Sequence, residues 1–201
     1  MMPATGIVPK GIPGFQKEAM LYNHNPVAAK DLLKQAGYPD GNGLPPLVLG
    51  YDVGVGHDKA AQAIQAQAGE VGITFNVASY EWEALLDRIQ AGEITFFRMD
   101  WTADYPTMDN FLYPLFHSSS LDNTTHYRNP EVDKLLMGAR RELNPGRRVR
   151  LYRKAEKIIL RDASIVPIGF YTTNRVIGSR VRGYIRTAVD DTPMERVWLS
   201  K

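Results

Sequence analysis

The sequence contains no cysteine and no long apolar run. Without cysteine, the chain has no disulfide, no thiolate nucleophile and no zinc or iron–sulfur site with cysteine ligands, and its redox compartment stays open. No stretch reaches the roughly 18 apolar residues that span a bilayer. The segment Met1–Gly6 also lacks the basic and then apolar start of a signal peptide.

An excess of charge of one sign is absent as well. The 24 basic and 22 acidic residues nearly cancel, so no large field favours nucleic acid or an anionic membrane as the main partner. The exception is a local concentration of basic residues between Arg140 and Lys157. Such a run is most typical of a solvated helix face, and a basic module that binds nucleic acid or an acidic partner is the alternative.

Apolar residues and helix signals are plentiful. With 201 residues and 44% apolar content, the chain is long enough for one domain, or one domain with an appendage. An asparagine followed by a proline, which suits the N-cap and first position of a helix, occurs at 25–26, 129–130 and 144–145. These pairs predict a helix that ends at Gly37 and a helical hairpin over 132–141 and 147–161.

Between these helices, strand and helix patterns alternate. Apolar runs at 46–51, 73–77 and 94–99 predict strands, and helical patterns separate them at 58–70 and 81–90. This order implies a parallel, three-layer sheet with right-handed crossovers. A further strand is expected at 165–171, and the irregular, polar residues after it look underpacked for a free-standing domain.

Ligands of open parallel sheets bind beyond the carboxyl ends of the strands. After the first strand, Gly54–Gly56 precedes a helix and suits an anion, but Lys59 stands where a dinucleotide fingerprint requires its third glycine. After the third strand, Asp104 lies between large aromatic residues, where desolvation would strengthen its attraction for a cation. Asp104 as the N-cap of a helix near 107–116 is the alternative, and the residues alone leave both open.

Catalytic and metal-binding patterns are not found. The histidines form neither an i, i+4 pair nor an H-E-x-x-H motif; they are His24, His57, His117 and His126. We therefore expect no metal site. A G-x-S-x-G elbow is also absent. We expect no cofactor and no enzymatic activity, with Asp104 as a general base the remaining enzymatic alternative.

Several stretches resemble one protein family. They are W-T-A-D-Y-P at 101–106, the N-x-x-x-Y and N-P-x-x-D patterns within 123–133, L-Y-R-K-A-E at 151–156, and A-K-D-L-L-K-Q-A-G-Y at 29–38. In these stretches the chain resembles the peptide/nickel-binding extracellular solute-binding proteins of ABC importers (family 5), and the oligopeptide-binding members most of all. The similarity covers essentially the whole chain in the right order and corresponds to the C-terminal portion of the family.

The resemblance implies an α/β fold, namely a lobe of a class II periplasmic-binding protein with a parallel-containing sheet flanked by helices. It implies a crossover or hinge segment at 1–14, the second, C-terminal lobe at 15–171, and a return segment toward the N-terminal lobe at 172–201. The family's first lobe, signal sequence and lipid-anchor cysteine do not occur in this sequence. We therefore expect residues 1–201 to be a fragment whose N-terminal lobe is missing.

The resemblance also implies a ligand and partners. A short peptide would bind in the cleft between two lobes, which close by hinge motion and deliver it to the ABC permease. This takes place on the periplasmic or extracellular face of the cytoplasmic membrane, and no nucleic acid is involved. Nickel, haem or a sugar is the alternative cargo within the family.

The site residues are implied by the same resemblance. Asp104 would pair with the free α-ammonium of the peptide, and Trp101 and Arg98 match ligand-facing positions in the pattern R-x-x-W-x-A-D-Y. Tyr105 and Tyr127 complete the predicted site. A charge-assisted hydrogen bond to the ammonium contributes about 1.5–3 kcal/mol. Since every peptide with a free N-terminus carries this cation, one carboxylate can fix the register of many sequences.

Overall fold

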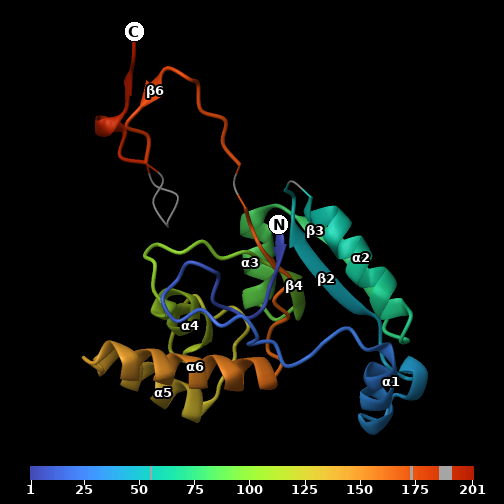
Figure 1. Ribbon diagram of the computed structural model, residues 1–201. Coiled ribbons are helices and arrows are strands. Elements are labelled where there is room, and N and C mark those ends of the chain that lie inside the picture. Colours follow the sequence, from blue (N-terminus) through green and yellow to red (C-terminus); the bar gives the residue numbers. More distant parts are fainter. Residues whose placement is uncertain (55, 173, 186–191) are drawn as a thin grey trace. The chain divides into compact units, whose positions relative to one another are not determined.

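The computed structural model describes residues 1–54, 56–172, 174–185 and 192–201. The chain divides into two compact units (Figure 1). Residues Tyr22–Asp100 form one, here called the sheet unit, and Met1–Leu21 with Trp101–Lys201 form the other, here called the helical unit. The predicted lobe at 15–171 thus spans parts of both units, and the division into crossover, lobe and return segments stays a prediction.

The sheet unit contains the predicted parallel sheet. Its strands are β2 (Leu47–Asp52), β3 (Phe75–Tyr80) and β4 (Phe96–Arg98), with the order β3-β2-β4 and parallel pairing throughout. Helix α2 (His57–Gly69) joins β2 to β3, and α3 (Trp82–Gln90) joins β3 to β4 (Figure 1). The β-α-β-α-β prediction is therefore confirmed.

Alternating residues of β2 contact the two helices. Leu49 packs with Ala61 of α2, whereas Val48 packs in the cluster of Leu85 and Ile89 of α3. Since successive side chains of a strand point to opposite faces, α2 and α3 cover opposite faces of the sheet. This is the expected three-layer arrangement.

The second strand begins later than predicted, at residue 75 instead of 73. The reason is the end of α2, where the N–H of Ile73 donates to the carbonyl of Ala68 at 3.0 Å. Gly72 has a positive φ of 94°, which is easiest for glycine, and makes this closure possible. Ile73 is thus used to end the helix and cannot start the strand.

The first helix follows its prediction. Helix α1 (Pro26–Gln35) begins after Asn25, whose side chain accepts a hydrogen bond from the N–H of Ala28 at 3.0 Å. Gly37, with φ of 91°, follows its C-terminal end, and a short 3-10 helix, η1 (Pro39–Gly41), comes next.

The helical unit is built on α4 (Met108–Phe116), α5 (Pro130–Arg141) and α6 (Pro145–Arg161), which share one apolar core. Helices α5 and α6 form the predicted hairpin and lie side by side (Figure 1). The Asn129 side chain accepts from the N–H groups of Glu131 and Val132, and that of Asn144 accepts from Arg147. The two predicted caps are confirmed.

The predicted strand at 165–171 is shorter than expected. Only β5 (Gly169–Phe170) forms, and it pairs antiparallel with β1 (Met2–Pro3). Pro167 lacks an N–H group and cannot donate to a ladder, which accounts for the late start. Farther on, β6 (Val181–Arg182) pairs with β7 (Trp198–Leu199), which follows the short 3-10 helix η2 (Met194–Arg196).

The part predicted as a return segment, 172–201, exposes large apolar side chains in its described ranges. Val176 and Trp198 are examples, as expected for an underpacked segment. Residues 173 and 186–191 lie outside the described residues. No helix in the ranges that the structure describes combines the length and apolar character needed to cross a membrane.

A buried carboxylate anchors the segment predicted as a crossover. Glu156 of α6, only 1% exposed, accepts hydrogen bonds from the N–H of Ile7 at 2.9 Å and of Val8 at 3.2 Å. Its second oxygen accepts from Gln16 Nε2 at 3.1 Å. Ile7, Val8 and Ile12 are themselves part of the helical core, so the middle of this segment is packed into the unit.

Candidate functional site: a loop organised by a buried asparagine

Trp101 and Asp104 are brought together by one buried side chain, Asn110. This residue lies in the first turn of α4 and is 2% exposed. Its Oδ1 accepts from Trp101 Nε1 at 3.1 Å and from the N–H of Asp104 at 3.1 Å. Its Nδ2 donates to Asp104 Oδ2 at 3.2 Å. Asn110 thereby uses both ends of its amide to hold the loop that precedes α4.

Asp104 is not the cap of α4. The N-cap is Thr107, so the alternative interpretation of Asp104 is wrong. Among the described residues of the helical unit, the Asp104 carboxylate has no cationic partner and accepts only from Asn110. Its position is therefore fixed while its charge is not neutralised.

The environment of Asp104 differs from the desolvated pocket that the flanking aromatic residues suggested. Asp104 and Tyr105 are both exposed, and only Trp101 is half-buried, because it packs against the helical core. Solvent screens an exposed carboxylate, which weakens its attraction for a cation. A strong ionic contact at Asp104 therefore requires a surface that closes over it.

Tyr105 braces the same loop against α4. Its hydroxyl donates to Asp109 Oδ2 at 3.0 Å, and Tyr152 of α6 donates to Asp109 Oδ1 at 2.7 Å. Arg140 of α5 approaches the same carboxylate, with Nε 3.5 Å from Oδ1. Burial raises the pKa of Tyr105 and of Tyr152, and the bonds to Asp109 act in the same direction. Asp109 thus links the candidate loop to all three helices of the unit.

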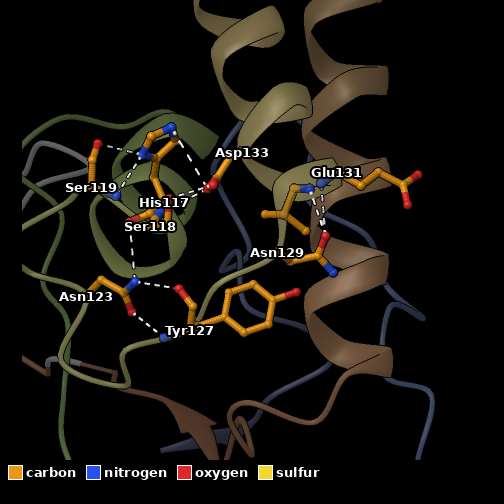
Figure 2. Close-up of polar contacts among 9 residues, drawn as sticks. His117, Ser118, Ser119, Asn123, Tyr127, Asn129, Glu131 and Asp133 are labelled. Atoms are coloured by element: carbon orange, nitrogen blue, oxygen red, sulfur yellow. Dashed lines mark hydrogen bonds and ion pairs between the residues drawn. The ribbon is translucent and has the colours of Figure 1, made fainter.

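Tyr127 is held in a different network. Its hydroxyl donates to Asp162 Oδ2 at 2.7 Å, at the end of α6. Asn123 brackets its backbone, accepting from the N–H at 3.1 Å and donating to the carbonyl at 2.8 Å (Figure 2). Burial raises the pKa of Tyr127, whereas the hydrogen bond from Tyr127 lowers the pKa of Asp162. In the described part of the chain no hydrogen bond joins Tyr127 to Asn110 or Asp104, and its contact with ligand stays a prediction.

The loop around Tyr127 is itself held by α5. Ser118 donates from its N–H and its hydroxyl to Asp133, at 2.9 and 2.6 Å. His117 Nε2 lies 3.9 Å from the same carboxylate, and its Nδ1 contacts Ser119 (Figure 2). The bonds to Asp133 therefore hold the start of the connection between α4 and α5, and the bonds of Asn123 hold its later part, around Tyr127.

Arg98, the remaining predicted site residue, belongs to the sheet unit. Its Nη2 lies 3.0 Å from Asp100 Oδ1, and Asp100 Oδ2 lies 3.8 Å from His57 Nε2. His57 Nδ1 in turn lies 2.6 Å from Asp52 Oδ1. These polar contacts lie at the carboxyl ends of β2 and β4, which is the edge expected to carry ligand loops. Val55, in the candidate anion loop at this edge, lies outside the described residues.

Sequence reasoning missed Asn110, Asp52 and Asp100, and it assigned His57 only a surface or structural role. Their positions carried a usable signal, because Asp52 ends β2, Asp100 lies two residues after the end of β4, and His57 begins α2. Asn110 offered none, since an asparagine within a helical pattern is ordinarily exposed. Across the described ranges, no group of three or more His, Asp or Glu side chains is arranged to hold a metal ion.

Comparison with known proteins shows the protein family to which this chain belongs. The family of bacterial extracellular solute-binding proteins, family 5 (middle region), matches residues 1–123. The chain belongs to this family, in agreement with the resemblance found in the sequence, and its fold is that of a part of a periplasmic binding protein.

Particular relatives support the same assignment. The oligopeptide-binding protein OppA of Bacillus subtilis is 30% identical over 191 residues, which are 92% of this chain and 35% of that protein. Heme-binding protein A of Haemophilus influenzae is 30% identical over 90% of this chain and 34% of its own length. The structure of the Escherichia coli murein tripeptide binding protein MppA superposes with a TM-score of 0.85, at 30% identity, over 99% of this chain and 40% of that one. The chain thus spans about a third of the length of these curated relatives.

Proposed function

We propose that this chain is part of the substrate-binding component of an ABC importer and that it binds short peptides, with Asp104 holding the free α-ammonium. The observation that carries the proposal is the Asp104 carboxylate, which Asn110 fixes in place and which has no cationic partner among the described residues of its unit. A fixed, exposed anion is suited to a mobile cation that every such peptide carries.

In this proposal, the same arrangement allows one site to bind many different peptides. Asp104 and Trp101 are both held through Asn110, so the register of a peptide is set at its N-terminus and not by its side chains. The rest of the backbone would lie extended, held by main-chain hydrogen bonds, with its side chains in wet, roomy pockets. Arg98, Tyr105 and Tyr127 are the further contacts in this proposal.

The rest of the proposal concerns the whole protein. An N-terminal lobe supplies the surface that closes over Asp104, and removal of water on closure strengthens the contact with the ammonium. The closed protein then docks on the membrane permease, on the periplasmic or extracellular side. The role is binding and transport without catalysis, as for the relatives, which are named as binding proteins.

Haem is the second candidate cargo, because heme-binding protein A is as similar to this chain as the peptide carrier of B. subtilis. Native mass spectrometry of the two-lobed protein, purified without added ligand, distinguishes between peptide and haem as the cargo. We expect a set of short peptides of several masses to be released on denaturation. Release of haem, with its visible absorption band, or of a sugar or nickel alone would contradict the peptide proposal.

A further inference from the structure

Helix α6 presents a row of cations to solvent. Arg147, Arg150, Lys154 and Lys157 recur at spacings of three and four residues, which places them on one face of the helix. All four are exposed. At 1.5 Å per residue, the row is about 15 Å long. We call these four residues the α6 stripe.

The charge of the α6 stripe is not compensated. The only acidic residue within α6 is Glu156, which is 1% exposed and bonded to Ile7, Val8 and Gln16. Among the residues that the structure describes, no carboxylate forms an ion pair with any of the four stripe side chains. Surface cations are ordinarily mixed with anions, so a face with none forms a local positive field in a chain whose net charge is only +2.

The opposite face of α6 is committed to the core. Tyr152, Ala155 and Ile159 are between 0 and 4% exposed and pack in the helical core. The helix cannot insert this face into a bilayer without unfolding the unit. Any partner of the stripe is therefore bound at its surface and by charge.

The residue types exposed on α6 limit the class of partner that can bind to the stripe. Protein interfaces depend on aromatic and apolar anchors, and single-stranded nucleic acids are held by stacking on aromatic rings. Duplex contacts recruit Ser, Thr, Asn and Gln beside the cations. From Arg147 on, every exposed residue of α6 is an arginine or a lysine, so the exposed positions of this helix include none of these residue types. A flat anionic surface, in contrast, requires only cations in a straight row.

We propose that the α6 stripe binds the anionic phospholipid headgroups of a bilayer. A straight helix whose cations all lie on one side can place them together at the level of the headgroups, where each contributes to binding in an additive, salt-sensitive way. This interaction is independent of the peptide site, and it goes beyond the proposed function by assigning the protein a second surface that keeps it near a membrane.

Co-sedimentation of the 201-residue chain with lipid vesicles tests the proposal at low ionic strength. One set contains phosphatidylcholine alone and the other also contains phosphatidylglycerol. The test variant is R147Q/R150Q/K154Q/K157Q, since glutamine keeps the helix propensity of these exposed positions. The control variant, K10Q/K30Q/K34Q/K59Q, removes the same number of charges from exposed positions elsewhere.

We expect binding to the phosphatidylglycerol vesicles only, a loss of at least about tenfold in affinity for the stripe variant, and little change for the control. Equal losses in both variants would overturn the proposal, because net charge alone would then be responsible. Failure of the parent chain to bind at low salt, or tighter binding to a DNA duplex or to an acidic peptide than to the vesicles, would also overturn it. Peptide affinity of the two-lobed protein is expected to be the same for both variants, so a failure of the proposed function would be seen separately.

Discussion

Asn110 is the residue on which the geometry of the candidate site depends. Trp101 and Asp104 do not contact each other by hydrogen bonds; each is bonded to the same buried amide. A buried amide with donors and acceptors matched in this way is costly to replace, because its partners lose their bonds in a place that water reaches poorly.

Replacement of Asn110 by alanine tests this dependence. Asn110→Ala leaves Trp101 Nε1 and the N–H of Asp104 without their acceptor, and we expect a loss of about 1–3 kcal/mol in the free energy of unfolding. Urea denaturation measures it. Asn23→Ala, at an exposed position, is the control and should change stability little. A result in which both variants lose the same small amount would show that Asn110 does not organise the loop.

The bond between Tyr127 and Asp162 makes a prediction about pH. This bond lowers the pKa of Asp162 from its ordinary value of 3.8. A carboxyl whose pKa is lowered by folding stabilises the folded state above its unfolded pKa, and this contribution is lost as the pH falls through the folded value. We therefore expect the stability difference between the parent and Tyr127→Phe to be full near neutral pH and to shrink below 3.8. Urea denaturation over a pH series measures it, and a difference that stays constant to low pH would contradict the account.

Among the secondary-structure elements, local signals were predictable and distant pairings were not. The Asn-Pro pairs predicted three helices correctly, because the N-cap asparagine and the proline after it stabilise the first turn of the same helix. The alternation of strands and helices also sufficed for the parallel sheet. The pairing of β5 with β1 joins residues 169–170 to residues 2–3, which are so far apart in the sequence that no local pattern could predict it.

The packing of the first segment onto α6 likewise depends on a distant contact. A Cβ added to Gly6 would lie 2.7 Å from the Ala19 Cβ and 2.8 Å from Glu156 Oε1. Gly6→Ala therefore pushes the segment away from the carboxylate that holds it, and we expect a loss of about 1–3 kcal/mol, as for other overpacked sites. Thermal unfolding measures it.

Gly69→Ala is the matched control, since a Cβ at Gly69, in the last turn of α2, has open space around it. There alanine should stabilise the protein by about 0.5–1 kcal/mol, because glycine is the weaker helix former. Stabilisation by both alanines would mean that the first segment is not held tightly against α6.

At the scale of the molecule, the predicted site residues fall in two units. Arg98 lies in the sheet unit, and Trp101, Asp104, Tyr105 and Tyr127 lie in the helical unit. The family was recognisable from short motifs, but the exposure of Asp104 was not correctly predicted, since flanking aromatic residues do not determine which surfaces cover a loop. In our account the cover is a second lobe, and the strength of the site is a property of the whole carrier.

The most direct test of this account compares two peptides and two variants in the two-lobed protein. Isothermal titration calorimetry would measure the affinity of one tripeptide with a free N-terminus and of the same tripeptide N-acetylated. The parent should prefer the free amine. Asp104→Asn should weaken the free-amine peptide by about 10- to 100-fold and the acetylated one little, because the lost interaction is a charge-assisted hydrogen bond to the ammonium.

Asp122→Asn, which removes a negative charge from an exposed loop of the same unit, should leave both affinities unchanged. Equal weakening of both peptides by Asp104→Asn, or no weakening of either, would contradict the central claim that Asp104 binds the peptide N-terminus.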